Sequence, residues 1–186
     1  DGCDASLGFL KTTPAETLEA EVPAIVVRRF HLIADSAGPG RWRGGHAVRL
    51  DLQVLRPEGQ VTARGMERLS FQPWGVAGGR AGTTGQVVLN PGTPGERSLP
   101  KIDLLALAPG DVLSIRTPGG GGHGNPLERP PERVLADVAA GLVTPAHARE
   151  AYGVVVTAGP RRRGGPAPPR ARRGAPAPPR GGHCRR

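Results

Sequence analysis

Residues 48–55 alternate between apolar and polar side chains, which is the period of a half-buried β-strand. The apolar side chains that share one face of this strand are Val48, Leu50, Leu52 and Val54. Short apolar runs between turn residues predict further strands over residues 24–30 (continuing toward 34), 61–69, 86–89 and 111–116. The turn at residues 57–59 indicates that 61–69 returns beside 48–55 as a hairpin.

A helical period replaces this alternation near the two ends of the chain. Residues 131–140 place Val134, Leu135 and Val138 on one face, and Gly141 is expected to end the helix. A second short helix is predicted over residues 144–152, and a third near the start, capped by Thr13. The fold class predicted is α+β, mainly antiparallel β with short helices near both ends.

A run of glycines, Gly119, Gly120, Gly121 and Gly122, follows the predicted strand 111–116. A Walker A loop would need Gly-Lys-Ser/Thr, and a dinucleotide loop would need a helix at the point where Asn-Pro follows. Two interpretations remain open. The loop presents backbone amides to an anionic substrate, or it is a corner that packs closely against other backbone.

The formal charge of +9 comes entirely from the last 30 residues, because residues 157–186 contain nine arginines and no acid. Residues 1–156 are electrically balanced, so a nucleic-acid partner is not expected for them. We therefore predict a domain over 1–156 and a disordered Arg/Pro/Gly-rich tail over 157–186. Two origins of the tail stay open: a segment that binds RNA or acidic surfaces, or GC-rich DNA translated out of frame.

Localisation signals are scarce. The sequence has no apolar run of membrane length, which predicts no membrane partner. Its two cysteines, Cys3 and Cys184, lie at opposite ends and form neither a disulfide framework nor a zinc spacing. A cytoplasmic location is the expectation from this cysteine usage.

A second constellation surrounds a glycine-rich turn, where Asp35 and Ser36 are followed by Arg41 and Arg43. A hydroxyl and two guanidiniums on one loop can bind a carboxylate or phosphate of a substrate. The alternative is a salt-bridged turn. His123, inside the glycine run, is the candidate catalytic residue, and the histidines have no metal-ligand spacing, so no metal site is predicted.

Six blocks taken in order resemble the C-terminal part of the hydantoinase B/oxoprolinase family. They lie at residues 13–23, 35–45, 73–82, 101–111, 117–129 and 137–155. The resemblance covers nearly all of residues 12–156 and does not extend to the tail. The chain departs from the family pattern at Gln72, Ala37, His123 and Asn125, where a basic residue, glycine, an aromatic and aspartate are usual.

This resemblance implies a component of an ATP-dependent enzyme that hydrolyses the C–N bond of a small cyclic amide, 5-oxoproline or a hydantoin, the former in glutathione metabolism. ATP would be handled by a partner, a hydantoinase A-type subunit or domain, in a hetero-oligomer. A divalent metal would belong to the N-terminal part of such a subunit, so the fragment is expected to be inactive alone. Two alternatives stay open: a subunit of an acetone/acetophenone-type carboxylase, and a non-catalytic fragment that makes subunit contacts.

Overall fold

The computed structural model describes residues 1–4, 14–63, 66–158 and 169–174 of the 186-residue chain. Its elements are short helices and short strands. In chain order they are α1 (Ala15–Glu21), β1 (Ile25–Leu32), β2 (Val48–Val54), β3 (Gly59–Val61), the 3-10 helix η1 (Met66–Leu69), β4 (Gln86–Leu89), β5 (Arg97–Leu99), β6 (Leu105–Leu107), β7 (Val112–Arg116), the 3-10 helix η2 (Pro126–Glu128), α2 (Pro131–Ala139), α3 (Pro145–Tyr152), β8 (Val154–Ala158) and β9 (Pro169–Arg173).

Five of the strands form one antiparallel sheet in the order β1-β2-β7-β4-β5. One face of this sheet is apolar because alternate side chains of β7 and β4 point the same way. One buried cluster on this face consists of Val87, Leu113 and Ile102. A second consists of Val54, Leu89 and Leu107. The predicted fold class, mainly antiparallel β with short helices, is confirmed.

The predicted hairpin between residues 48–55 and 61–69 is wrong. Both edges of β2 are already paired, one with β1 and the other with β7, so no hydrogen-bonding edge remains for a third strand. The chain leaves β2 through Glu58, whose φ is +65°, and β3 pairs with β6 instead. Residues 66–69 then form η1 rather than a strand.

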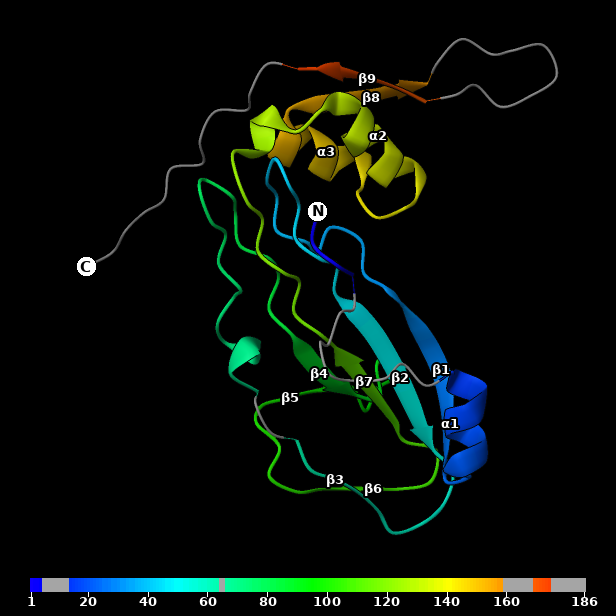
Figure 1. Ribbon diagram of the computed structural model, residues 1–186. Coiled ribbons are helices and arrows are strands. Elements are labelled where there is room, and N and C mark those ends of the chain that lie inside the picture. The colour runs from blue at the N-terminus through cyan, green and yellow to red at the C-terminus, as the bar shows by residue number, and fades with distance from the viewer. Residues whose placement is uncertain (5–13, 64–65, 159–168, 175–186) are drawn as a thin grey trace, which may run out of the picture.

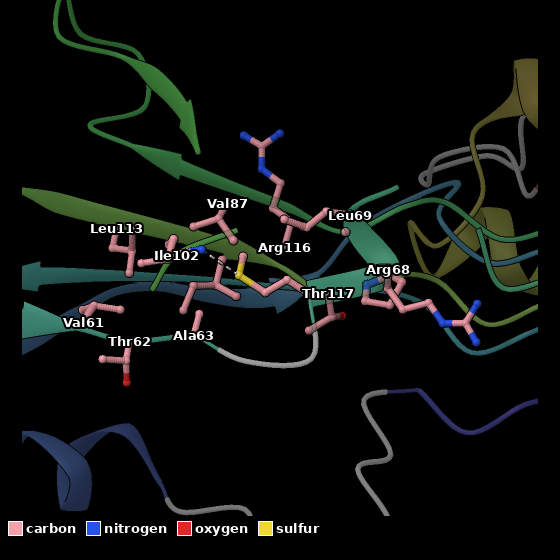
Figure 2. Close-up of a pocket in the computed structure, with 14 residues that line it drawn as sticks. Val61, Thr62, Ala63, Arg68, Leu69, Val87, Ile102, Leu113, Arg116 and Thr117 are labelled. Carbon is pink, nitrogen blue, oxygen red and sulfur yellow. Dashed lines mark hydrogen bonds between the residues drawn. The ribbon is translucent and has the colours of Figure 1, made fainter. Parts of the chain in front are cut away.

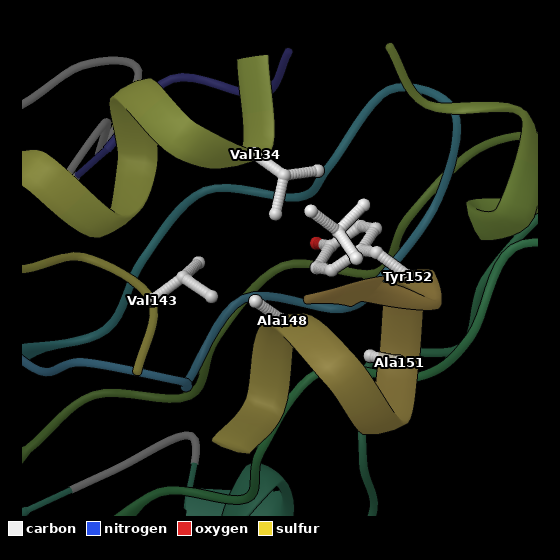
Figure 3. Packing of buried hydrophobic residues seen from close by; sticks show 6 residues of the cluster. Val134, Val143, Ala148, Ala151 and Tyr152 are labelled. Atoms are coloured by element: carbon white, nitrogen blue, oxygen red, sulfur yellow. The ribbon is translucent and has the colours of Figure 1, made fainter. Parts of the chain in front are cut away.

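The last part of the chain makes a small helical unit, defined here as α2, α3, β8 and β9 (Figure 1). Its interior is a cluster of small apolar residues around one tyrosine, as Figure 3 shows: Val134, Val143, Ala148, Ala151, Tyr152 and Val154. Burial raises the pKa of Tyr152 to about 12. The two helices predicted from the sequence are confirmed, and Gly141 and Gly153 follow them with φ of +73° and +65°.

Strand β9 falls in the segment that the sequence predicts to be disordered. It pairs with β8, and its Ala171 packs against the cluster of the helical unit, while the disordered tail over 157–186 stays a prediction. Strand β8 also runs across the predicted boundary at residue 156. Thr13, the predicted helix cap, lies outside the described residues, and the helix that follows begins after Pro14.

Figure 1 shows the sheet and the helical unit at opposite ends of the molecule. Long extended segments run between the two ends, and the residues predicted to form the site lie on them. The fold therefore brings the two predicted constellations, the glycine run and the Asp35–Arg43 turn, into the same part of the molecule.

Candidate functional site

Three extended segments lie side by side between the sheet and the helical unit, and we call them the glycine bundle: residues 35–45, 73–82 and 118–124. Backbone hydrogen bonds join them. The amide of Gly38 donates to the carbonyl of Gly120 at 2.7 Å, that of Gly122 to Arg80 at 2.9 Å, and that of Val76 to Gly122 at 2.9 Å. The third segment is thus held between the other two by main-chain groups.

Glycine is required in this bundle because the segments approach too closely for a Cβ atom. A Cβ placed on Gly121 would lie 1.9 Å from the carbonyl oxygen of Trp74, and one on Gly119 would lie 1.8 Å from that of Ser36. Gly122 would meet the Pro39 carbonyl at 2.2 Å. Close packing against other backbone, one of the two interpretations left open above, is therefore what the structure shows.

The amides of this run are turned inward. Gly119, Gly120 and Gly122 donate to the carbonyls of Thr83, Gly45 and Arg80. Amides used in this way are not directed at a ligand, so the substrate-binding role assigned to Gly119–Gly122 stays a prediction.

Asp35 and Ser36 make contacts within the protein. Asp35 adopts a φ of +60° and accepts two hydrogen bonds from Thr144, from its amide and its hydroxyl, both at 2.7 Å. Thr144 is the residue that caps α3, so Asp35 ties the glycine bundle to the helical unit. The buried hydroxyl of Ser36 donates to the carbonyl of Ile33 and accepts from the amide of Ala47.

The two predicted arginines, Arg41 and Arg43, lie in different environments. Arg43 is buried, and its guanidinium pairs with Asp4 near the start of the chain at 3.1 Å and with Asp137 of α2 at 3.3 Å. Arg41, two residues away, is exposed. The structure therefore does not bring Asp35, Ser36, Arg41 and Arg43 together around one ligand.

Arg43 belongs to a carboxylate–arginine cluster whose members are Asp1, Asp4, Arg43, His46, Arg129 and Asp137. Its two arginines, His46 and Asp137 are buried. Arg129, whose side chain is 1% exposed, forms a bidentate pair with Asp1 at 2.6 and 3.0 Å and a further bond to Asp137 at 2.8 Å. Its guanidinium also lies 5.9 Å from the ring centroid of Tyr152. Sequence reasoning missed Arg129, although an aspartate on the inner side of helix 131–140 was a signal that a buried cation faces it.

The exposed rim of the glycine bundle carries the two remaining candidates, Arg41 and His123, and beside them Trp42. The backbones of Trp42 and His123 exchange both hydrogen bonds, so the two side chains project from the same side of the bridge. Trp42 is 41% exposed, and the guanidinium of Arg133 lies 4.8 Å from its ring centroid. An aromatic face beside a histidine and two arginines can bind a flat, polar ring and move a proton.

A separate apolar pocket of about 270 Å³ opens between η1 and the sheet, as Figure 2 shows. Val87, Ile102 and Leu113 form its floor, and the sulfur of Met66 accepts a hydrogen bond from the Ile102 amide at 3.4 Å. None of the predicted site residues lines it. Its chemistry is that of a hydrophobic contact surface rather than of a catalytic centre.

Within the described ranges, His, Cys, Asp and Glu side chains do not form a group of three that could hold a metal ion. Among the helices described, none is both long and apolar enough to cross a bilayer.

The comparisons with known proteins agree on one family. A family model described as hydantoinase B/oxoprolinase matches residues 1–126, and the chain belongs to this family. It is 36% identical over 153 residues to caprolactamase subunit beta of Pseudomonas jessenii, which covers 80% of this chain and 26% of that subunit. It is 32% identical over 122 residues to the 5-oxoprolinase PfmaA of Pestalotiopsis fici, covering 62% of this chain and 9% of that protein.

Solved structures give the same fold. The ATP-dependent caprolactamase from Pseudomonas jessenii superposes with a TM-score of 0.67 at 29% identity, over 83% of this chain and 29% of that one. A nucleotide-free acetone carboxylase superposes with a TM-score of 0.65 at 21% identity, over 81% of this chain and 24% of that one. The chain thus spans about a quarter of the length of caprolactamase subunit beta and less than a tenth of that of the 5-oxoprolinase PfmaA.

Proposed function

We propose that this chain contributes to an ATP-dependent hydrolase that opens the C–N bond of a cyclic amide, as part of a hydantoinase B-type component. The observation that carries the proposal is the likeness to one relative in both sequence and fold, the caprolactamase of Pseudomonas jessenii. A lactam, 5-oxoproline and a hydantoin share a ring amide, so one site can serve this substrate class. With 5-oxoproline as substrate the reaction would belong to glutathione metabolism, in the cytoplasm.

ATP in this proposal is handled by a hydantoinase A-type partner in a hetero-oligomer. The name of the caprolactamase relative, a subunit beta, supports a partner subunit. The absence of a Walker A motif from the sequence also favours ATP binding elsewhere in the assembly. The described residues do not fit a metal site, so no step of the reaction is assigned to a metal held by them.

For the residues of this chain we propose two roles. Arg41 and His123 on the rim contact the substrate, Arg41 by charge and His123 by proton transfer, with Trp42 as the surface beside them. Asp35, Ser36 and Arg43 act as positioning residues, since their side chains bind other parts of the protein.

The test is a substrate screen with the complete hydantoinase B-type component that contains this chain, assembled with its A-type partner. ATP hydrolysis should depend on 5-oxoproline, hydantoin or caprolactam, and ring-opened product should appear in step with ADP. Arg41→Ala should weaken this turnover by about tenfold or more, the value of one charged hydrogen bond. Arg97→Ala, on exposed β5, is the matched control and should leave turnover unchanged.

A ketone-carboxylase role is the second candidate, favoured by the fold likeness to acetone carboxylase. ATP hydrolysis that needs acetone and bicarbonate, and that ignores every cyclic amide, would replace the hydrolase proposal. Normal turnover in both Arg41→Ala and His123→Ala would instead remove the rim from the substrate site and favour the non-catalytic fragment that makes subunit contacts, the second alternative from the sequence.

A further inference from the structure

The stretch of chain from residue 71 to residue 76, at one side of the glycine bundle, exposes three apolar side chains. Phe71 is 68% exposed, Trp74 is 72% exposed and Val76 is 55% exposed, and we call these three residues the aromatic patch. An aromatic side chain removes roughly 150–250 Å² from water when it is buried, so two rings left in solvent are a notable feature of a sequence with 3% aromatic residues. Contiguous exposed apolar surface of this kind marks an interaction site.

Main-chain contacts hold the aromatic patch in place. The Val76 amide donates to the Gly122 carbonyl, and the Val76 carbonyl accepts from the Gly124 amide, both at 2.9 Å. The carbonyl of Trp74 lies so close to Gly121 that a Cβ atom there would be 1.9 Å from its oxygen. The exposed side chains are therefore presented on a fixed backbone, which reduces the entropy lost when another surface binds.

The aromatic patch continues into two neighbouring features. Val76 and Trp42 both pair with His123, so the patch adjoins the exposed rim. In the opposite direction, Arg68 places its guanidinium 5.6 Å from the Trp74 ring centroid and also lines the apolar pocket beside η1. A surface that joins exposed rings to a pocket of about 270 Å³ can receive an apolar side chain of another surface as an anchor.

Arg68 gives this surface a positive charge. Its guanidinium donates to the Gln72 carbonyl at 3.3 Å, and Figure 2 shows it directed away from the apolar pocket. Among the described residues, no carboxylate forms an ion pair with Arg68. Tryptophan, phenylalanine and arginine are the side chains enriched in protein interfaces. A surface that covers Arg68 has to bring a carboxylate to it, because a buried charge without a partner is costly.

The length of a relative indicates where the covering surface comes from. The match covers 26% of caprolactamase subunit beta, so about three quarters of such a component lies outside it. A component that left both rings in solvent until its partner subunit arrived would tend to aggregate. Coverage by the rest of the same component is therefore favoured over coverage by the A-type partner.

We propose that the aromatic patch is the docking surface for the remaining part of a hydantoinase B-type component, which packs apolar side chains on Phe71 and Trp74 and sets a carboxylate against Arg68. The inference rests on the proposed place of this chain within such a component, and it does not depend on the reaction. Because the patch adjoins the rim, the docked part forms a second wall beside Arg41 and His123. The candidate site then lies between two parts of one component.

Hydroxyl-radical footprinting with mass spectrometry tests the docking in three samples: the 186-residue chain, the complete B-type component that contains it, and that component with its A-type partner. Phe71 and Trp74 should be oxidised readily in the chain, and severalfold more slowly in the complete component without the partner. Buried Tyr152 should be protected in all three samples, which shows that the helical unit is folded.

Two results would overturn the proposal. One is equal oxidation of Trp74 in the chain and in the complete component. The other is protection that appears only when the A-type partner is added, because the patch would then belong to the interface between subunits. Neither result depends on turnover, so failure of the docking proposal and failure of the hydrolase proposal are distinguishable.

Reversing the charge of Arg68 in the complete component tests the expected carboxylate. Arg68→Glu should raise the oxidation of Trp74 severalfold, because two carboxylates would then face each other, and Arg68→Lys should keep Trp74 protected. Arg97→Glu, on exposed β5, controls for added negative charge and should also leave Trp74 protected. Protection of Trp74 that is unchanged in Arg68→Glu would refute a carboxylate opposite Arg68.

Discussion

The sheet and the glycine bundle are both made of extended chain joined by main-chain hydrogen bonds, yet they are held together in opposite ways. In the sheet, side chains such as Leu113 and Val87 fill the apolar clusters, so their volume stabilises the fold. In the bundle, a single added carbon at Gly121 would overlap a carbonyl oxygen. Side-chain volume is thus the source of stability in one region and is excluded from the other.

The glycines of the bundle lose much conformational freedom on folding, and the surroundings of the bundle offset this cost. Glycine is less favourable than alanine by roughly 0.5–1 kcal/mol in regular extended or helical chain, because it loses more freedom on folding. Pro39, Pro73 and Pro118 restrict the backbone of the three segments, and Asp35 and Arg43 fasten the first segment to the helical unit. The bundle is therefore a rigid support for its rim rather than a flexible loop.

The most severe test of the contrast is to add one methyl group to the bundle. We expect Gly121→Ala to destabilise the chain by more than about 4 kcal/mol, since its Cβ would lie 1.9 Å from the Trp74 carbonyl and backbone cannot yield as a side chain does. Chemical denaturation of the full chain measures the change. Gly120→Ala, where the nearest atom is 3.0 Å away, should cost less.

Gly95→Ala provides the matched control for that experiment. The nearest atom to its added Cβ, a Thr93 side-chain oxygen, is 3.6 Å away, which is ordinary contact. It should change the free energy of unfolding by less than about 0.5 kcal/mol. Equal effects of Gly121→Ala and Gly95→Ala would show that the bundle can open to admit a side chain.

Removing volume from the sheet is the converse change. Leu113→Ala, at a position 3% exposed in the cluster with Val87 and Ile102, should lower the free energy of unfolding by about 3 kcal/mol. The loss combines the buried apolar surface with the cavity left behind. Leu104→Ala, at an exposed position, serves as its control, and similar losses at both sites would contradict the assigned core.

The sequence predicted the sheet better than the bundle, for a physical reason. Alternation over residues 48–55 and the helical period over 131–140 are local patterns, and both elements appear where they were expected. The partner of β2 was not predictable in this way, because nothing local in residues 61–69 reveals that β1 and β7 occupy both edges of that strand.

At the site, the sequence indicated candidate residues better than it indicated what each of them contacts. The glycine run and the Asp35–Arg43 turn lie side by side in the structure, which no local pattern in the sequence predicted. Their side chains, however, face distant parts of the chain: Thr144 for Asp35, and Asp4 and Asp137 for Arg43. Such long-range partners leave no local signal, so a binding turn and a structural turn look alike in sequence.

Charge in the sheet gives a third, smaller prediction. Asp51, on β2, is 3% exposed. Burial raises its pKa, but hydrogen bonds from Arg49 and the charges of Arg49 and Arg29 outweigh burial and lower that pKa below its ordinary value. A lowered pKa contributes stability above the unfolded value that is lost as pH falls, so unfolding should become easier below about pH 4. Asp51→Asn should lower the free energy of unfolding by about 2 kcal/mol at neutral pH, and it should make that free energy depend less on pH below about pH 4. If Asp51→Asn leaves the loss of stability at low pH unchanged, Asp51 is not its cause.

The smallest expected effect lies where the glycine bundle meets the helical unit. The hydroxyl of Thr144 caps α3 by accepting from the His147 amide at 3.2 Å and donates to Asp35 at 2.7 Å. Thr144→Ala should therefore cost about 1 kcal/mol, the usual value of a helix cap. Hydrogen exchange should rise in the amides of α3 and leave those of β2 and β7 unchanged, because the cap stabilises only the helical unit. Thr62→Ala, at an exposed position of the sheet end, is the control. Faster exchange throughout the sheet in Thr144→Ala would mean that the bundle transmits the loss, and that the two ends of the molecule unfold as one.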